Sequence, residues 1–155
     1  MISGLLFDLD GTLVDTAPDM AAALNILLKN HQQKSQGFKE CRAQVSHGVK
    51  GLIKLGFKID INHPSYSNLA QQFLNIYQDL NHKNSQLFSG MESLLQHLKT
   101  CQIPFGIVTN KPRYLTIPLL KTLGIEKDFG CIYCGDDMPQ RKPDPAPLLA
   151  ACKTL

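Results

Sequence analysis

The sequence ISGLLFDLDGT occupies residues 2–12 and decides how the rest of the chain is interpreted. Residues 2–7 are almost wholly apolar, which is typical of a short β-strand buried on both faces. Asp8 and Asp10 follow directly, and Gly11 marks a turn. The stretch therefore predicts a buried strand with polar chemistry at its carboxyl end.

Two later stretches repeat this design. Residues 105–108 (FGIV) run into Thr-Asn-Lys at 109–111, and residues 131–134 (CIYC) run into a glycine and two aspartates. Leucines at helical spacing lie on either side of the second strand, within residues 94–98 and 115–123. Alternating strands and helices predict a doubly wound parallel α/β sheet, in which ligands bind beyond the carboxyl ends of the strands.

Residues 17–87 interrupt this alternation, because they carry helical patterns and no convincing buried strand. Thr-Ala-Pro-Asp at residues 16–19 is typical of a capping box with proline in the first helical turn. The expected organisation is an α/β core formed by residues 1–16 and 88–155, with a helical cap inserted at 17–87.

Composition and charge exclude several classes of protein. The chain has 155 residues, of which 43% are hydrophobic and 19% charged, as in ordinary packed domains. Its net charge of +3, without a basic run, predicts no nucleic-acid partner and no binding to a membrane surface. The sequence has no apolar run of about 18 residues and does not start like a secretory signal. We therefore expect a cytoplasmic protein with no membrane-spanning helix.

Asp8 and Asp10 are the first candidates for chemistry. Two carboxylates at one strand end suit Mg²⁺, which prefers oxygen ligands and shares carboxylates with a bound phosphate. An aspartate can also attack phosphorus and form an acyl phosphate. The alternative is that both residues merely cap the turn, since aspartate is common in turns. Taken alone, the pair favours the turn.

Three motifs in order make the pattern specific. FDLDGTLVD at residues 7–15 resembles the first motif of the haloacid dehalogenase superfamily, VTN at 108–110 resembles the second, and RKPDP at 141–145 resembles the third. The resemblance covers nearly the whole chain and implies an α/β fold with a helical cap. Asp10 is informative because the dehalogenases of this superfamily lack a second aspartate there. The resemblance thus implies a phosphoric monoester hydrolase.

The resemblance also implies a role for each motif residue. Asp8 would attack phosphorus and form an aspartyl phosphate, while Asp10 would protonate the leaving alcohol and later activate water. Mg²⁺ would bind the Asp8 carboxylate and the Asp10 main-chain carbonyl. Thr109 would donate both its hydroxyl and its amide hydrogen to the phosphoryl group. The expected phosphate-binding residues are Gly11, Thr109, Asn110 and Lys142.

Residues outside the motifs are weaker candidates. His47 and Gly48 lie where related enzymes place a cap loop over the substrate, and we expect them to influence specificity. Lys111 and Arg113 are interpreted as solvated basic residues, with Lys111 close enough to the site to remain a weak candidate. The two aspartates at 136–137 are interpreted as part of a turn.

The expected substrate is a small phosphorylated metabolite, with 2-phosphoglycolate favoured. N-acetylmuramic acid 6-phosphate, a sugar-phosphate mutase reaction and an inactive phosphate-binding fragment remain as alternatives. The superfamily's fourth motif, an acidic pair that completes magnesium binding, is expected downstream of the helix that begins near Asp144. Because the sequence stops at Leu155, we expect part of the core to be absent. The sequence leaves open whether the protein is a monomer or a homodimer.

Overall fold

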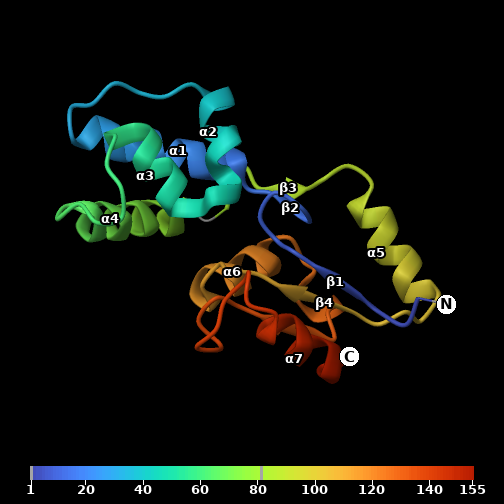
Figure 1. The fold of residues 1–155 in the computed structure, drawn as a ribbon. Helices are drawn as coiled ribbons and strands as arrows, with labels where there is room; N and C mark the ends of the chain where they lie inside the picture. The colour runs from blue at the N-terminus through green and yellow to red at the C-terminus, as the bar shows by residue number, and fades with distance from the viewer. Residues whose placement is uncertain (1, 81) are drawn as a thin grey trace. The chain divides into compact units, whose positions relative to one another are not determined.

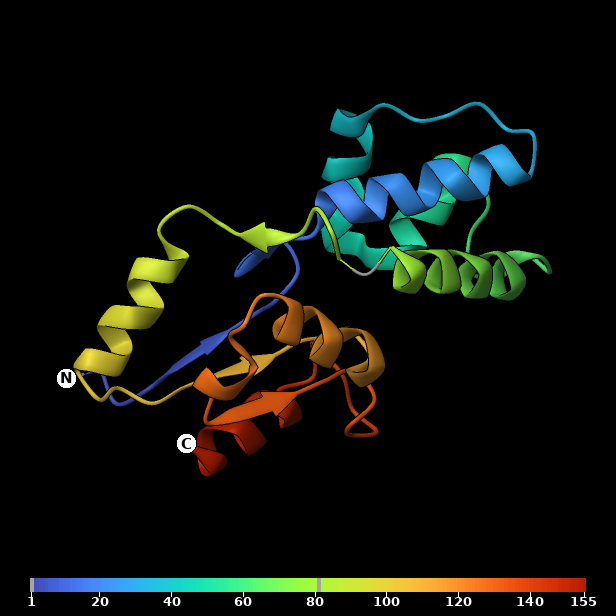
Figure 2. The ribbon, with the colours of Figure 1, turned by 180° about the vertical axis from the view of Figure 1, so that it is seen from behind.

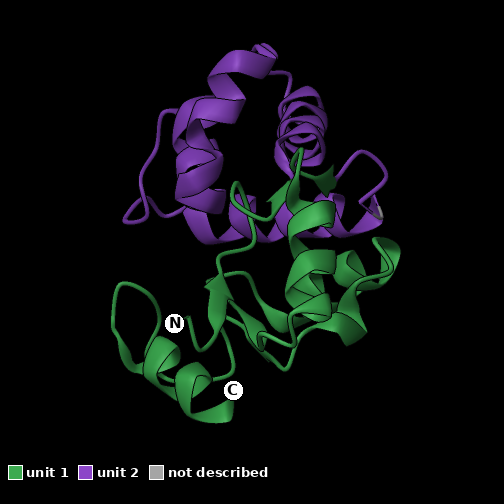
Figure 3. Cartoon of the chain, turned by 90° about the vertical axis from the view of Figure 1, so that its right-hand side faces the viewer, with its two compact units in different colours: residues 1–15, 86–155 green, residues 16–85 purple. Residues whose placement is uncertain are grey.

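The computed structural model describes residues 2–80 and 82–155, which form two compact units (Figure 3). Unit 1 consists of residues 1–15 and 86–155, and unit 2 of residues 16–85. These boundaries lie close to those expected from the sequence. Whether unit 2 works as a cap remains a prediction.

A three-stranded parallel sheet forms the centre of unit 1 (Figure 1). Its order is β1 (Leu5–Phe7), β4 (Phe105–Val108) and β5 (Cys131–Tyr133), with β4 in the middle. In the central strand, a Cβ atom on Gly106 would lie 2.5 Å from the Sγ atom of Cys131. Glycine at this position therefore allows the two strands to pair with the cysteine side chain between them.

The first strand is shorter than expected, because it begins at Leu5 and not at Ile2. The main-chain amide of Leu5 donates to the carbonyl of Pro104 at 3.0 Å. Pro104 has no amide hydrogen and cannot donate a hydrogen bond in return. The hydrogen-bond ladder between β1 and β4 therefore begins at Leu5. Ile2 lies before this point and is 66% exposed.

Helices cover both faces of this sheet, which confirms the doubly wound α/β fold (Figures 1 and 2). Helices α5 (Met91–Thr100) and α6 (Arg113–Thr122) pack on one face, and α7 (Ala146–Thr154) packs against β4 and β5. A short 3₁₀ turn, η2 (Glu126–Asp128), follows α6. Apolar side chains of α5, α6 and the strands make the larger core cluster, which includes Phe7, Leu95, Leu98, Ile107, Leu119 and Leu120.

Two very short strands lie where the chain leaves unit 1 and returns to it. β2 (Val14–Asp15) pairs antiparallel with β3 (Gln86–Leu87). The sequence had assigned the second of these to the helical segment, which was wrong. A strand of two residues contains no periodicity that could separate it from a helix end.

Unit 2 is helical, and its helices pack on one another through apolar faces. Helix α1 (Ala17–Asn30) contacts α2 (Phe38–Gln44), α3 (Gly48–Phe57) and α4 (Tyr66–Asp79). The buried side chains include Leu24, Leu27, Leu52 and Phe73. No helix in the described part of the chain is long and apolar enough to cross a membrane. A short 3₁₀ turn, η1 (Val45–His47), lies between α2 and α3.

The expected capping box at the start of α1 is wrong. Thr16 is the N-cap residue, but its side chain makes no capping hydrogen bond. Asp19 is fully buried, and its carboxylate accepts hydrogen bonds from the Asn84 amide at 3.1 Å and the Ser85 hydroxyl at 2.7 Å. The Asn84 side-chain amide donates to it as well, at 2.9 Å. The Asp19 carboxylate therefore makes hydrogen bonds to residues distant in sequence and not to the first turn of its own helix.

Candidate active site

The carboxyl ends of the three parallel strands bring the motif residues together. Asp8 follows β1 directly, and Lys142 comes from the segment that follows β5. The Nζ atom of Lys142 lies 2.7 Å from Oδ1 of Asp8 and also donates to the carbonyl of Val108 at 2.7 Å. A carboxylate and an ammonium group that are 134 positions apart in sequence therefore form one ion pair.

Asn110 holds the main chain of Lys142 at both of its polar groups. Its side-chain Nδ2 donates to the carbonyl of Lys142 at 2.9 Å, and its Oδ1 accepts the amide hydrogen of Lys142 at 3.0 Å. Gly135 lies against Asn110, because a Cβ atom there would be 2.1 Å from the Asn110 carbonyl oxygen. The Asn110 amide therefore orients Lys142, and its expected contact with phosphate remains a prediction.

Asp10 has a lysine partner of its own. The Nζ atom of Lys111 lies 3.1 Å from Oδ1 and 3.4 Å from Oδ2 of Asp10. The side chain of Lys111 is only 5% exposed, so its interpretation as a solvated residue was wrong. Its position in the sequence could have indicated this contact, because Lys111 lies between the end of one strand and the start of the next helix, at the same sheet edge as Asp10.

Thr109 and Gly11 contribute differently from what the sequence suggested. The amide of Thr109 donates to the carbonyl of Tyr133 at 2.9 Å, so this hydrogen belongs to the sheet and not to a phosphate site. The Thr109 hydroxyl accepts the Lys111 amide hydrogen at 3.1 Å, and a hydroxyl can still donate its own proton. Gly11 has φ of +80°, and its amide donates to Val14 at 2.9 Å. Its phosphate contact remains a prediction.

A charged network fixes the turn between β5 and Lys142. The Nε atom of Arg113 donates to Asp137 at 2.6 Å, and the main-chain amide of Arg113 donates to Asp136 at 2.7 Å. Hydrogen bonds from Arg113 hold the pKa of Asp137 below its ordinary value of 3.8. Arg113 is therefore a structural partner of this turn, whereas the two aspartates occupy a turn as expected.

The residues expected to influence specificity lie in unit 2. His47 ends η1 with an exposed side chain, and Gly48 begins α3 with φ of +60°. A positive φ of this kind is easily adopted by glycine and strained for other residues. The role of both residues in specificity remains a prediction.

The donor set at the strand ends fits Mg²⁺ in part. In residues 2–80 and 82–155, no group of three or more histidine, cysteine or acidic side chains is arranged to hold a metal ion. Asp8 and Asp10 nevertheless supply oxygen atoms, and the Asp8 side chain is 43% exposed and thus accessible. Mg²⁺ commonly uses one or two carboxylates together with waters and a substrate phosphate. The Asp8 carboxylate meets that requirement, and the Asp10 main-chain carbonyl would supply a further oxygen.

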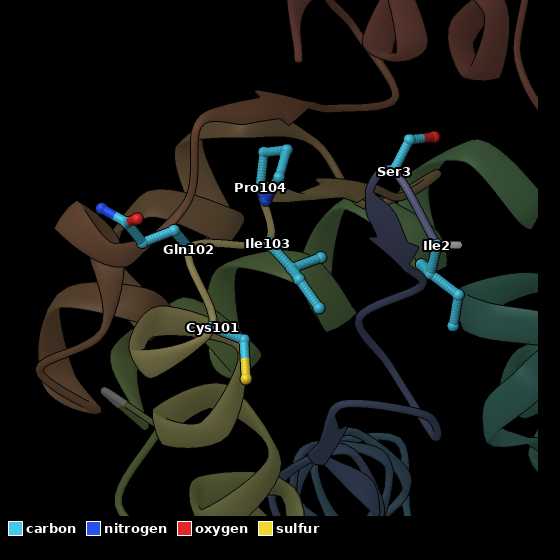
Figure 4. A pocket seen from close by; sticks show the side chains of 6 residues that line it. All are labelled: Ile2, Ser3, Cys101, Gln102, Ile103 and Pro104. Carbon is cyan, nitrogen blue, oxygen red and sulfur yellow. The ribbon is translucent and has the colours of Figure 1, made fainter.

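A surface pocket of unit 1 lies at the other end of the sheet (Figure 4). Its residues precede β1 and β4, so it lies at the amino ends of these strands. The motif residues follow the carboxyl ends, which makes the pocket separate from the candidate site. The pocket is lined by Ile2, Ser3, Cys101, Gln102, Ile103 and Pro104.

Comparison with known proteins decides which family this arrangement represents. The family described as haloacid dehalogenase-like hydrolase matches residues 5–155. The chain belongs to this family. The match includes all three motifs and confirms the resemblance seen in the sequence.

The curated relatives of this haloacid dehalogenase-like hydrolase are phosphatases. It is 38% identical over 151 residues to a phosphoglycolate phosphatase of Xanthomonas campestris, covering 97% of this chain and 68% of the relative. It is 34% identical over 154 residues to an N-acetylmuramic acid 6-phosphate phosphatase of Pseudomonas putida, covering 99% of this chain and 69% of the relative. The chain is therefore a phosphoric monoester hydrolase of this family by descent.

Solved structures show the same fold. The crystal structure of a predicted phosphoglycolate phosphatase from Haemophilus somnus superposes with a TM-score of 0.83 at 25% identity, covering 98% of this chain and 71% of that one. CbbY of Rhodobacter sphaeroides, solved with phosphate, superposes with a TM-score of 0.73 at 21% identity, covering 99% and 72%. The second likeness bears on the fold alone.

Proposed function

We propose that this protein hydrolyses a small phosphate monoester in the presence of Mg²⁺, through an aspartyl phosphate on Asp8. The observation that carries the proposal is the position of Lys142, whose Nζ atom lies 2.7 Å from Oδ1 of Asp8 at the end of β1. A lysine at this distance pairs with the carboxylate and would neutralise charge on an incoming phosphoryl group. The phosphatase relatives support the reaction class.

In the first step, an oxygen of Asp8 attacks phosphorus and the bond between phosphorus and the ester oxygen breaks. Asp10, in its protonated form, gives its proton to the leaving oxygen, so an alcohol departs. Asp8 then carries the phosphoryl group as a mixed anhydride. Lys142 stabilises the negative charge on the transferring phosphoryl group, because its ammonium group lies beside Asp8.

In the second step, water attacks the phosphorus of the aspartyl phosphate. The Asp10 carboxylate takes a proton from this water, the bond between phosphorus and the Asp8 oxygen breaks, and inorganic phosphate leaves. The Thr109 hydroxyl, which follows β4, would donate to a phosphoryl oxygen. Both aspartates are thereby returned to their starting states.

Mg²⁺ would be held by the Asp8 carboxylate and the Asp10 carbonyl, where it would offset the repulsion between carboxylate and phosphate. When Asp8 and Asp10 are both ionised, their charges balance those of Lys142 and Lys111. The ion would therefore act mainly on the charge that the substrate adds. We propose the cytoplasm as the compartment of this reaction.

The substrate we favour is 2-phosphoglycolate. The support is the phosphoglycolate phosphatase relative of Xanthomonas campestris, at 38% identity. A specific observation also favours a second candidate, because the Pseudomonas putida relative at 34% identity is a phosphatase for N-acetylmuramic acid 6-phosphate. The residues that would choose between the two substrates are those expected in unit 2, His47 and Gly48.

The test is phosphate release by the chain with 2-phosphoglycolate, N-acetylmuramic acid 6-phosphate and p-nitrophenyl phosphate, each with and without Mg²⁺. Asp8→Asn removes the nucleophile and keeps the shape, and Asp79→Asn changes an exposed aspartate of unit 2 as a matched control. We expect Mg²⁺-dependent release that falls by at least about 1,000-fold in Asp8→Asn and stays unchanged in Asp79→Asn.

Each outcome has a definite meaning for the proposal. Faster turnover of one natural ester than of the other identifies the substrate. Equal turnover in the wild type and in Asp8→Asn overturns the mechanism. A folded chain that releases phosphate from none of the three esters overturns the proposed activity and favours the inactive phosphate-binding alternative.

A further inference from the structure

Lys111 is a buried cation whose ammonium group contacts the carboxylate of Asp10. Its side chain is 5% exposed, and its Nζ atom lies within 3.4 Å of both oxygens of Asp10. A lysine is rarely buried to this extent, because removing an ammonium group from water is costly unless an anion compensates for it. The contact with Asp10 supplies that compensation.

The main chain of Lys111 is held from three directions. Its amide donates to the Thr109 hydroxyl at 3.1 Å, and its carbonyl accepts the Gly135 amide at 2.9 Å. The Thr116 hydroxyl of α6 also donates to this carbonyl, at 3.3 Å. The end of β4, the turn after β5 and helix α6 thus fix the base from which the side chain extends.

The two carboxylates of the site have separate lysines. Lys142 contacts Asp8, and Lys111 contacts Asp10. Asp10 follows the β1 strand and is 21% exposed at its side chain, so its carboxylate could rotate about its side-chain bonds if nothing held it. Proton transfer to a leaving oxygen requires the donor within hydrogen-bond distance and correctly directed.

We propose that Lys111 is a positioning residue for Asp10, which holds the carboxylate in the orientation from which it exchanges protons with the ester oxygen and the water. This inference rests on the proposed role of Asp10. It also goes beyond that role, because it assigns a function to a lysine outside the three motifs.

The leaving group provides a measurement that separates positioning from general damage. The alcohol of 2-phosphoglycolate must be protonated as it leaves, whereas p-nitrophenolate leaves as a stable anion and needs little help from an acid. The ratio kcat/KM reports the steps up to release of the leaving group. Lys111→Met keeps the length of the side chain and removes the charge.

We expect Lys111→Met to lower kcat/KM for 2-phosphoglycolate by about 30-fold or more, within the range that acid catalysis supplies. The loss for p-nitrophenyl phosphate should be no more than about threefold. Lys111→Arg should recover most of the activity towards the alkyl ester. Lys121→Met changes an exposed lysine of α6 and serves as the matched control, with no effect on either ester.

Equal losses for both esters would overturn the proposal, because they would show a structural role. A second measurement works without turnover. In NMR spectra of the chain labelled with ¹⁵N-lysine, one ammonium signal should vanish in Lys111→Met and shift in Asp10→Asn. Absence of the shift overturns the proposal. If the wild type hydrolyses no ester while the shift is seen, the proposed function fails and the contact stands.

Discussion

Asn110 acts on the site through the main chain of Lys142 and not through a free amide. Two hydrogen bonds, at 2.9 and 3.0 Å, join its side chain to the carbonyl and amide of Lys142. The Nζ atom of the same lysine lies 2.7 Å from Asp8. The position of one side chain therefore controls where a cation meets the nucleophile.

Asn110→Ala should loosen this arrangement without unfolding the chain. Two hydrogen bonds of about 1 kcal/mol each are lost, so we expect inorganic phosphate to bind up to about 30-fold more weakly. The measurement is the dissociation constant of phosphate by isothermal titration calorimetry, with Asn75→Ala as a control on an exposed helix position. Equal phosphate affinity in both variants would contradict the role of Asn110.

For single residues, the sequence predicted which side chains form the candidate site better than it predicted how far each one is buried. Asp8 and Lys142 were expected near one another and lie in contact. The burial of Lys111 was missed, since a lysine after a threonine and an asparagine looks like any solvated residue. Its burial depends on how β4, α6 and the β5 turn meet in space.

At the scale of elements, the turn after β5 depends on one ion pair. Arg113 at the start of α6 donates to Asp137, which also accepts the amide of Cys134 at 2.7 Å. The pKa of Asp137 is thereby lowered from 3.8. Since the folded form has the lower pKa, this stabilisation is present above pH 3.8 and is lost as the pH falls through the lowered value.

Asp137→Asn should therefore destabilise the chain near neutral pH and do so less in acid. We expect a loss of at most about 1 kcal/mol in the free energy of unfolding, because Arg113 is 46% exposed and water screens the pair. Urea unfolding at pH 6.5 and pH 3 checks this. A difference between wild type and variant that persists unchanged at pH 3 would contradict the assignment.

Elements were predictable where they are long or strongly patterned. The three core strands and the helices between them follow from apolar runs and leucine spacing. The strands β2 and β3 could not be predicted in this way, because a strand of two residues is too short to show an alternation of apolar and polar residues. The predicted capping box is absent for a different reason. The Asp19 carboxylate accepts hydrogen bonds from Asn84 and Ser85, which lie 65 and 66 positions later in the sequence.

At the scale of the whole molecule, hydrogen bonds join the beginning of unit 2 to its end. Unit 2 begins and ends within a few residues of one cluster, in which Asp19 accepts hydrogen bonds from Asn84 and Ser85. Asp19 and Ser85 are buried whereas Asn84 is exposed, so loss of the carboxylate would leave the buried Ser85 hydroxyl without this partner. The cluster therefore joins the first turn of α1 to the last residues of the unit.

Asp19→Asn should destabilise unit 2 by about 1–3 kcal/mol, because an amide nitrogen replaces one accepting oxygen. Urea unfolding and amide hydrogen exchange of α1 and α4 measure the effect. Asp60→Asn, an exposed aspartate whose carboxylate accepts the Asn62 amide, is the matched control. Equal stability of the two variants would show that the cluster does not close the unit.

The doubly wound fold of unit 1 could be predicted because three strands, separated by helical patterns, each end in polar residues. The division into units was also close to that expected. The substrate could not be predicted, since both phosphatase relatives share the motifs and differ in what they hydrolyse. Recognition of the alcohol depends on side chains that no motif specifies.

The most direct test of the central claim is to trap the intermediate. The chain is mixed with Mg²⁺ and its preferred ester, quenched within the first turnover and treated with borohydride, which reduces an acyl phosphate to an alcohol. The account predicts reduction at Asp8 alone, located by mass spectrometry of the peptide that contains it, and none in Asp8→Asn. Phosphate release with no reduced residue, or with reduction at a different carboxylate, would contradict it.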